Sequence, residues 1–272
     1  MKKTLEYLFK YDGGKRFFLT WLFLLPPCVL VGFFFPTTKY MDFLFGFRTT
    51  EYATFGDLWT GVFPVFPYAW IALAAAAVLF VLGVGYVSSI LTRHIRVGKL
   101  TFPNFFRSIN NNFFPALTVT AFFLLTVFAA HVLFVLNAYI WVHLASRLLG
   151  LVMTVLFFLL ILIGMAYLMS SATLWLPYMS FTGTYVFRAL GIAFYKSRNR
   201  QRQFFLPCLF AVVFALAAGL AGYYCPLWYV DAIIHTLVYS VSLTVMVTFT
   251  IISYCEVESV QREDLSRPFF GR

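Results

Sequence analysis

Six long apolar stretches that carry no charged side chain are the feature that most limits how this chain can fold. Each has about the 20 residues that a helix needs to cross the hydrocarbon of a bilayer, or more. The stretches span residues 17–36, 66–92, 113–140, 148–176, 204–224 and 232–255. We therefore expect an all-α polytopic membrane protein with about six transmembrane helices, which form a single domain over residues 1–272.

The composition agrees with a surface that faces lipid rather than water. Hydrophobic residues make up 62% of the chain and charged residues 11%, whereas a soluble domain has roughly 25% charged residues. The net charge of +10 lies mostly in short segments between the apolar stretches. Basic residues in such segments meet the anionic headgroups of lipids, so we expect the bilayer as a partner and no nucleic acid.

The Lys and Arg residues divide unevenly between the two sides of the predicted bundle. If the stretches alternate across the membrane, 17 of the 20 basic residues fall on the side of both termini. The other side has Lys39, Arg48 and Arg147. By the positive-inside rule, we expect a multi-pass protein of the cell membrane, the inner membrane of a bacterium, with both termini in the cytoplasm.

The first apolar stretch follows a basic N-terminus, which is also the order of a cleaved signal peptide. The charged region extends to Arg16, however, and no small-x-small cleavage site follows the apolar residues. We therefore expect an uncleaved first span, loosened by Pro26 and Pro27 because each proline removes a helical hydrogen-bond donor. The fourth stretch is longer than a bilayer requires, so we expect it to tilt or to project from the membrane.

Several segments between the spans have the pattern of amphipathic helices. Apolar side chains recur at helical spacing in residues 101–113, after the candidate N-cap Thr101, and in residues 182–196. We expect both segments to form short interfacial helices on the cytoplasmic side. The order span, basic amphipathic segment, span then occurs twice, as a weak internal repeat. Residues 40–63 predict a short re-entrant or surface helix on the other side, and residues 256–272 a short disordered or partner-binding tail.

Polar side chains within or beside the apolar stretches are candidate functional groups, because they are costly in a membrane. They are His131, Asn137, Asp231 and His235. An outward-facing cluster of His131, Asp231 and His235 with His143 would bind a metal or relay protons. The alternative, which we favour, is that Asp231 caps the last span and the histidines form separate hydrogen bonds, since the sequence has no HExxH or cysteine-rich ligand spacing. We expect no metal and no other cofactor.

Motifs for enzymatic chemistry are missing from the sequence. It has no GxSxG, GxGxxG or GxxxxGK[ST] motif, and its four cysteines form no CxxC pair. We therefore expect neither an enzyme nor a disulfide framework. Ala218 and Gly222 form a small-xxx-small pair, which favours close helix packing, either within one bundle or between copies of the chain in a homo-oligomer.

Basic residues on the cytoplasmic side form a second set of candidate site residues. They could bind a lipid headgroup, a polyprenyl phosphate or an acidic membrane protein partner. The alternative, which we favour, is that they only fix the topology, because the positive-inside rule already predicts such residues. The set comprises Arg93, Arg96, Lys99, Arg107, Arg188, Lys196, Arg198, Arg200 and Arg202.

Two blocks of the chain share an order of features. In LTRHIRVGKLTFPNFFRSINNNFFPAL, residues 91–117, a span ends in a basic stretch that leads through a Phe-rich segment into the next span. Residues 174–206, LWLPYMSFTGTYVFRALGIAFYKSRNRQRQFFL, have a similar order. Both blocks resemble the YesL-like family of small bacterial membrane proteins, whereas residues 40–63 depart from the family pattern. That family has no established biochemical activity, and its members are often associated with carbohydrate uptake systems, so the resemblance implies an accessory role.

Three function classes follow from these observations. Our leading hypothesis is a non-enzymatic integral membrane accessory or assembly factor that is associated with a transport system. The alternative is a transporter or flippase of a lipid-linked or amphiphilic substrate, which the repeat, the proline-broken first span and the basic face favour. An intramembrane enzyme has the least support. A polar cavity near the middle of the membrane would favour the transporter, and a close-packed bundle would favour the accessory protein.

Overall fold

The computed structural model describes residues 1–10, 14–46, 54–63, 67–98, 103–144, 146–225 and 227–265. Regular structure within these ranges is helical throughout, without strands. Six helices are long and apolar enough to cross a membrane, which confirms the predicted all-α polytopic fold. They are α2 (Lys15–Phe34), α5 (Pro67–Val97), α6 (Phe105–Leu144), α7 (Arg147–Ser171), α10 (Gln201–Tyr223) and α11 (Trp228–Val257).

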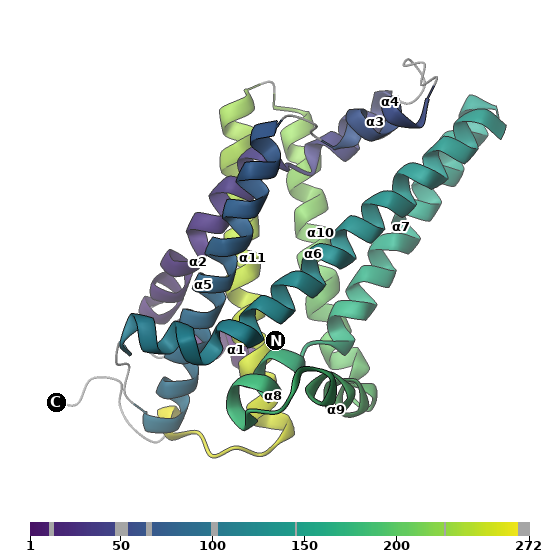
Figure 1. Ribbon diagram of the computed structural model, residues 1–272. Coiled ribbons are helices and arrows are strands. Elements are labelled where there is room, and N and C mark those ends of the chain that lie inside the picture. The colour runs from purple at the N-terminus through teal and green to yellow at the C-terminus, as the bar shows by residue number, and fades with distance from the viewer. Residues whose placement is uncertain are drawn as a thin grey trace.

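The six long helices pack in a ring. Each contacts its neighbour in the order α2, α5, α6, α7, α10 and α11, and α11 returns to α2. Figure 1 shows α2, α5 and α11 side by side, whereas α6 and α7 form an antiparallel hairpin that inclines away from them. The ring therefore has two apolar cores. The larger contains Leu24, Val84 and Ile251, and the smaller joins Phe43 to Phe134.

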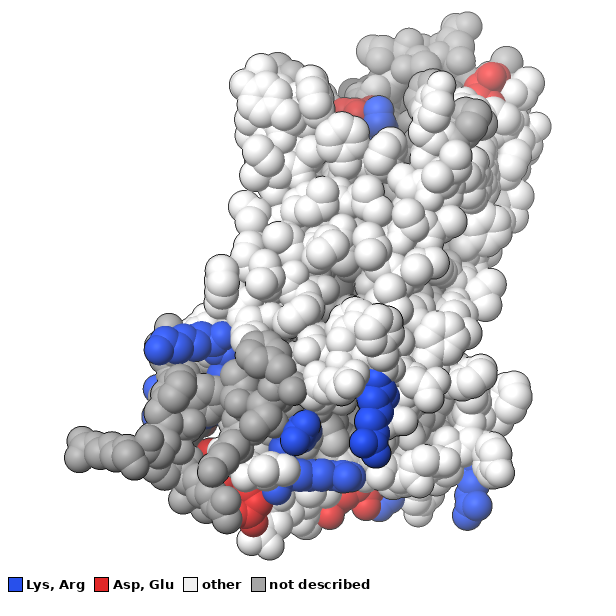
Figure 2. Space-filling view, turned by 60° about the vertical axis from the view of Figure 1, so that its left-hand side comes forward, with Lys and Arg blue, Asp and Glu red and all other residues white. Residues whose placement is uncertain are grey.

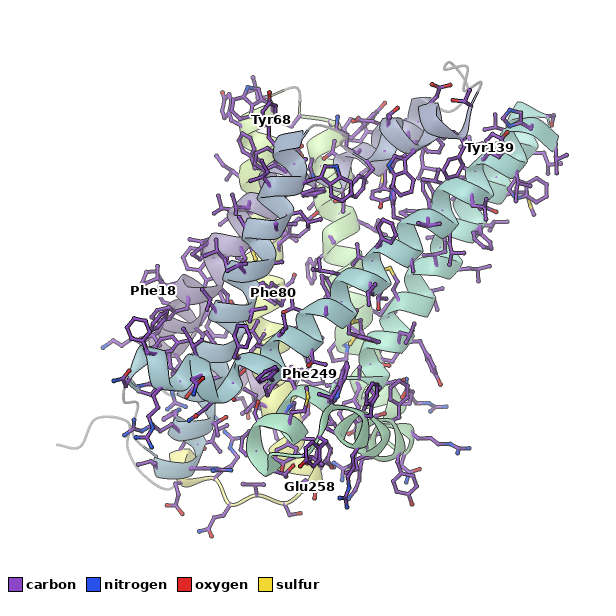
Figure 3. All side chains as sticks on the ribbon, in the orientation of Figure 1. Phe18, Tyr68, Phe80, Tyr139, Phe249 and Glu258 are labelled. Carbon is purple, nitrogen blue, oxygen red and sulfur yellow. The ribbon has the colours of Figure 1, made fainter. Side chains whose placement is uncertain are left out.

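Charged residues gather at one end of the bundle. Figure 2 shows most Lys and Arg side chains, with several Asp and Glu, at the lower end, and a band without charge above them. We call this lower end, with α8 (Trp175–Thr182) and α9 (Val186–Arg198), the basic end, and the opposite end the charge-poor end. Figure 3 shows Glu258 at the basic end, and Tyr68 and Tyr139 at the charge-poor end. Aromatic rings at such a level suit the interface between membrane and water.

Two short helices cover the charge-poor end. They are α3 (Thr38–Gly46), which packs on α10, and α4 (Phe55–Val62), which packs on α6. α4 begins with a capping box, in which the Thr54 hydroxyl accepts from the Asp57 N–H at 3.2 Å and the Asp57 carboxylate accepts from the Thr54 N–H at 2.9 Å. The segment expected to hold one short helix thus holds two.

The first amphipathic segment is not a separate interfacial helix. α6 runs from Phe105 to Leu144 without a break, through Pro115, and Figure 1 shows its first turns lying more nearly across the bundle than the rest. The Asn104 side chain accepts from the Arg107 N–H at 3.4 Å and so caps the helix. The cap predicted at Thr101 lies outside the described residues.

The fourth apolar stretch, which was expected to tilt or to project from the membrane, inclines together with α6 but does not continue as one helix. α7 ends at Ser171, and after a turn α8 begins at Trp175. The Ser170 and Ser171 hydroxyls both donate to the Tyr167 carbonyl, and Gln201 at the start of α10 donates to the Ser170 hydroxyl at 2.6 Å. Local side-chain bonds of this kind compete with helix continuation. The remaining short elements at the basic end are α1 (Lys2–Leu5), a π-helical turn η1 (Glu6–Lys10) and a 3₁₀ turn η2 (Glu263–Leu265).

Candidate functional site

Near the charge-poor end, the junction between α2 and α3 forms polar contacts with both α10 and α11. The Thr37 N–H donates to His235 Nε2 at 3.1 Å, and the Thr37 hydroxyl donates to the Ala215 carbonyl of α10 at 2.7 Å. The Thr38 hydroxyl donates to Asp231 Oδ1 at 2.7 Å. We call Thr37, Thr38, Asp231 and His235 the threonine–histidine network. It joins the α2–α3 junction to both α10 and α11.

The protonation state of His235 follows from its neighbours. A neutral imidazole has one N–H and one acceptor nitrogen, and Nε2 accepts here because the Thr37 N–H can only donate. Nδ1 therefore carries the proton. It lies 2.9 Å from the Asp231 carbonyl oxygen and 3.0 Å from Asp231 Oδ1, one helical turn earlier. Both ring nitrogens of His235 are thus satisfied within the protein.

Two glycines of α10 make room for the network. A Cβ at Gly219 would lie 2.8 Å from the Thr37 hydroxyl oxygen, and a Cβ at Gly222 would overlap the Asp231 carboxylate and the Thr38 hydroxyl. Only glycine allows the helices to approach this closely. The small-xxx-small pair Ala218 and Gly222 is buried inside the bundle, so its packing is internal to one chain.

An order of carboxylate, imidazole and hydroxyl also occurs in hydrolytic triads, and here the same side chains join the α2–α3 junction to α10 and α11. The Thr37 N–H donates to His235 Nε2, and the Thr37 hydroxyl lies within hydrogen-bond distance of two acceptors, the Ala215 carbonyl at 2.7 Å and His235 Nε2 at 2.9 Å. His235 has no exposed surface. The network therefore holds three chain segments together.

His131 lies in a different environment, between α6 and the short helices. Its ring is 4.7 Å from that of Trp59 and 4.9 Å from that of Phe63, measured between centroids. The Tyr40 hydroxyl and His131 Nδ1 are 3.0 Å apart and share a hydrogen bond. The ring is 2% exposed, and its Nε2 has no hydrogen-bond partner. We call Tyr40, Trp59, Phe63 and His131 the aromatic box.

Three further polar residues of the α6–α7 hairpin are paired within α6 or have an unpaired atom. Asn137 Oδ1 accepts from the Trp141 indole at 3.0 Å, while Asn137 Nδ2 has no partner. The Thr154 hydroxyl of α7 is likewise buried without a partner. His143 lies at the exposed end of α6, and its Nδ1 contacts the Tyr139 carbonyl at 2.9 Å.

The hypothesised outward-facing cluster of three histidines and Asp231 is therefore divided among separate contacts. Asp231 and His235 belong to the threonine–histidine network, His131 to the aromatic box, and His143 to the end of α6. Among the described residues, no group of three or more His, Cys, Asp or Glu side chains is placed to hold a metal ion.

The described basic candidate residues lie at the basic end, on four helices. Arg93 and Arg96 are exposed on the last turns of α5, and Arg107 is exposed at the start of α6. Arg188, Lys196 and Arg198 are exposed on α9, Arg200 caps α10, and Arg202 is exposed in its first turn. Lys99 lies outside the described residues.

Some of these residues have partners. Lys196 Nζ lies 3.2 Å from the Glu258 carboxylate, which also accepts a hydrogen bond from the Tyr178 hydroxyl. The bond from Tyr178 and the neighbouring Lys196 hold the pKa of Glu258 below its ordinary value. Arg96 lies over the Phe181 ring, with its guanidinium carbon 4.9 Å from the centroid.

A buried ionic cluster at the basic end was not predicted from the sequence. The side chains of Arg16 and Asp264 approach to 4.0 Å, and Arg262 Nη2 donates to Asp264 at 2.8 Å. The Arg16 guanidinium lies 4.8 Å from the centre of the Tyr7 ring, and the Tyr7 hydroxyl lies 2.6 Å from His94 Nδ1. The cluster ties η1, α2 and α5 to η2.

This cluster corrects the expectation of a short disordered or partner-binding tail from residue 256. Residues 256–265 are described and return to the bundle, where Asp264 is only 4% exposed. Acidic residues facing a basic N-terminal segment were the available signal, since a buried charge needs an opposite partner. Residues 266–272 lie outside the described residues.

Together the six apolar helices, the uncharged band and the internally paired polar groups define a multi-pass α-helical integral membrane protein. Comparisons of the chain with protein-family models, curated proteins and solved structures find no match.

Proposed function

We propose that this protein is a non-enzymatic accessory or assembly factor of the cell membrane, with its basic end and both termini in the cytoplasm. It would act on another membrane protein, and the YesL-like resemblance suggests a transport system as that partner. The observation that carries the proposal is the state of the intramembrane charge. Asp231 and His235, a carboxylate–imidazole pair within the last span, join the α2–α3 junction to α11 through Thr37 and Thr38.

The proposal follows from what transporters and intramembrane enzymes require. Both need polar groups that a substrate, an ion or water can reach, and such groups in spans default to functional roles. Asp231 and His235 bond to each other and to the α2–α3 junction. They therefore contribute to a fixed structure instead. The protein's action on other molecules must then come from its surface.

The exposed surface differs among the spans. Half of the most apolar stretch of α5 is buried in the bundle. The corresponding stretches of α6 and of the span that begins with α7 are only 22% and 17% buried. The α6–α7 hairpin therefore presents most of its apolar surface to lipid or to another membrane protein. In a membrane, helices associate through close packing and not through exclusion of water, so such a surface can exchange lipid for a partner at low cost.

A second candidate, a transporter or flippase of a lipid-linked or amphiphilic substrate, has one specific observation in its favour. Buried polar atoms without partners occur in the α6–α7 hairpin: His131 Nε2, Asn137 Nδ2 and the Thr154 hydroxyl. Polar atoms without a hydrogen-bond partner are costly in hydrocarbon. Polar groups of a substrate that moves through the protein would form hydrogen bonds with them one after another.

Deletion of the gene in its host separates the two candidates. We expect one membrane complex to lose assembly on native gels of solubilised membranes, and the wild-type chain to restore it. The double variant His131→Ala/Asn137→Ala should also restore assembly, because an accessory factor does not use these side chains for transport. Native mass spectrometry of the purified protein in mild detergent should give the chain without a stoichiometric polyprenyl phosphate.

The opposite results would overturn the accessory role. If membrane complexes stay intact while a lipid-linked precursor accumulates, and if the double variant fails to relieve that accumulation, the protein is a transporter. A polyprenyl phosphate that co-purifies in stoichiometric amount would point to the same conclusion.

A further inference from the structure

The structure separates two kinds of basic residue that the sequence cannot distinguish. In the tail region, Lys3 pairs with Glu256 and both Arg16 and Arg262 face Asp264. Within the described residues, the side chains of four arginines of α9 and its junction with α10 form no ion pair, hydrogen bond or ring contact with the rest of the chain. They are Arg188, Arg198, Arg200 and Arg202. Basic side chains near the tail are thus paired with acidic ones, whereas these four arginines are not. We call the part of the basic end around Lys3, Arg16 and Arg262 the tail corner, and the part around the four arginines the α9 corner.

The exposed face of α9 is aromatic as well as basic. Ala189, Ala193 and Ser197 are buried against the bundle. On the opposite face, Phe187 is 86% exposed and Tyr195 is 74% exposed. At 100° per residue, Arg188 and Arg198 fall on that same face, next to these rings. Lys196, which points toward Glu258, lies to one side of it.

A face of this composition does not suit water. A helix that faces water buries its rings and exposes its charges, whereas α9 exposes both together. Large rings beside arginines are typical of helices that lie in the boundary of a bilayer, where the rings enter the acyl region and the charges meet the headgroups. Figure 1 views α9 nearly end-on, while the spans run from the lower to the upper end of the picture, so α9 crosses the direction of the spans as an interfacial helix does.

We propose that the exposed face of α9, together with Arg200 and Arg202 at the start of α10, binds the headgroups of anionic phospholipids of the surrounding bilayer. The free guanidinium groups offer paired N–H donors to phosphate oxygens, which accept such donors well. Phe187 and Tyr195 lie beside these guanidinium groups and enter the adjoining acyl region of the bilayer. This binding goes beyond topology, because the side chains of these four arginines have no partner within the described residues, whereas Lys3, Arg16 and Arg262 near the tail have acidic partners.

The test uses the full chain in detergent micelles that contain either phosphatidylglycerol or phosphatidylcholine, with bound lipid counted by native mass spectrometry. We expect wild type to retain phosphatidylglycerol in preference to phosphatidylcholine. Arg188→Gln/Arg198→Gln should lower phosphatidylglycerol retention by about fivefold or more, since each basic residue at an anionic surface contributes severalfold to binding. The matched control, Lys2→Gln/Lys3→Gln, removes the same charge from the tail corner and should retain lipid as wild type does.

A second variant tests the aromatic part without a change in charge. Phe187→Ala/Tyr195→Ala should also lower retention, though less than loss of the arginines. All substituted side chains are exposed, so thermal unfolding in detergent should match that of wild type. Equal losses in the arginine variant and the lysine control would overturn the site, because net charge alone would then explain binding. An unchanged lipid count, with loss of a co-purifying acidic protein, would overturn it in favour of a protein partner.

Discussion

Two histidines lie within the spans toward the charge-poor end, and their surroundings differ in how far the ring nitrogens are satisfied. His235 has a partner on each nitrogen, from the Thr37 N–H on one side and from Asp231 on the other. His131 shares one hydrogen bond with Tyr40, and its second nitrogen faces aromatic rings without a partner. Both rings are buried.

The difference shows what a polar residue in a span can mean. A satisfied imidazole fixes the positions of the segments that satisfy it, so replacing it should cost stability. An imidazole with an unpaired nitrogen loses its hydration on burial, and no hydrogen bond at that nitrogen offsets the loss. Replacing such an imidazole should therefore cost little or no stability. Stability measurements can therefore tell the two environments apart without knowledge of the protein's partner.

The largest effect is expected where the threonine–histidine network meets α10. Gly222→Ala would place a Cβ against the Asp231 carboxylate and the Thr38 hydroxyl, and would force α10 away from α11. We expect a loss of about 3 kcal/mol or more in the free energy of unfolding, at the upper end for overpacking. Unfolding can be followed with a thiol-reactive dye, because Cys28, Cys208 and Cys255 are buried in the folded chain.

Gly164→Ala on α7 is the matched control for this substitution. A Cβ at Gly164 would meet nothing within 4 Å. Alanine is also preferred over glycine in helices by roughly 1 kcal/mol, so this variant should be as stable as wild type or more stable. Similar destabilisation of both variants would mean that the close approach at Gly222 is not what limits stability.

The same replacement at each histidine tests the comparison directly. His235→Phe removes the acceptor of the Thr37 N–H and the donor to Asp231, and we expect a loss of about 2–3 kcal/mol. His131→Phe gives up the bond to Tyr40 but fills the aromatic box with a ring that has no unpaired nitrogen, so its cost should stay below about 1 kcal/mol. The dye assay measures both, and a larger loss at His131 would contradict the distinction.

The spans could be predicted from the sequence because length and apolar composition alone decide which segments cross hydrocarbon. The predicted stretch 232–255 lies within α11, and the stretch 113–140 lies within α6. The i, i+4 spacing of Asp231 and His235 also predicts their shared helix face. These inferences need only residues that are close in sequence.

The partners of those residues could not be predicted in the same way. Thr37 and Thr38 follow a proline in a segment that resembles any loop, and they meet His235 and Asp231 from almost 200 residues away. Gly222 gave the one available signal, since a small residue marks a close approach but does not say to what. The pairing of Asp264 with Arg16 was hidden for the same reason, because burial of the tail depends on the assembled bundle.

The smallest effect is expected for a pair of buried threonines that repeats the contrast between the histidines. The Thr154 hydroxyl of α7 has no partner, whereas the Thr244 hydroxyl of α11 donates to the Ser240 carbonyl at 2.8 Å. Thr→Val keeps the shape and removes the hydroxyl. We expect Thr154→Val to be neutral or to stabilise by up to about 1 kcal/mol, because it deletes a desolvated group that gains nothing. Thr244→Val should destabilise by roughly 0.5 kcal/mol, the mean for a membrane hydrogen bond. The sign of the difference between the two variants carries the result. If Thr154→Val proved the more harmful, the Thr154 hydroxyl would have a polar partner in the membrane, and that partner would favour the transporter over the accessory factor.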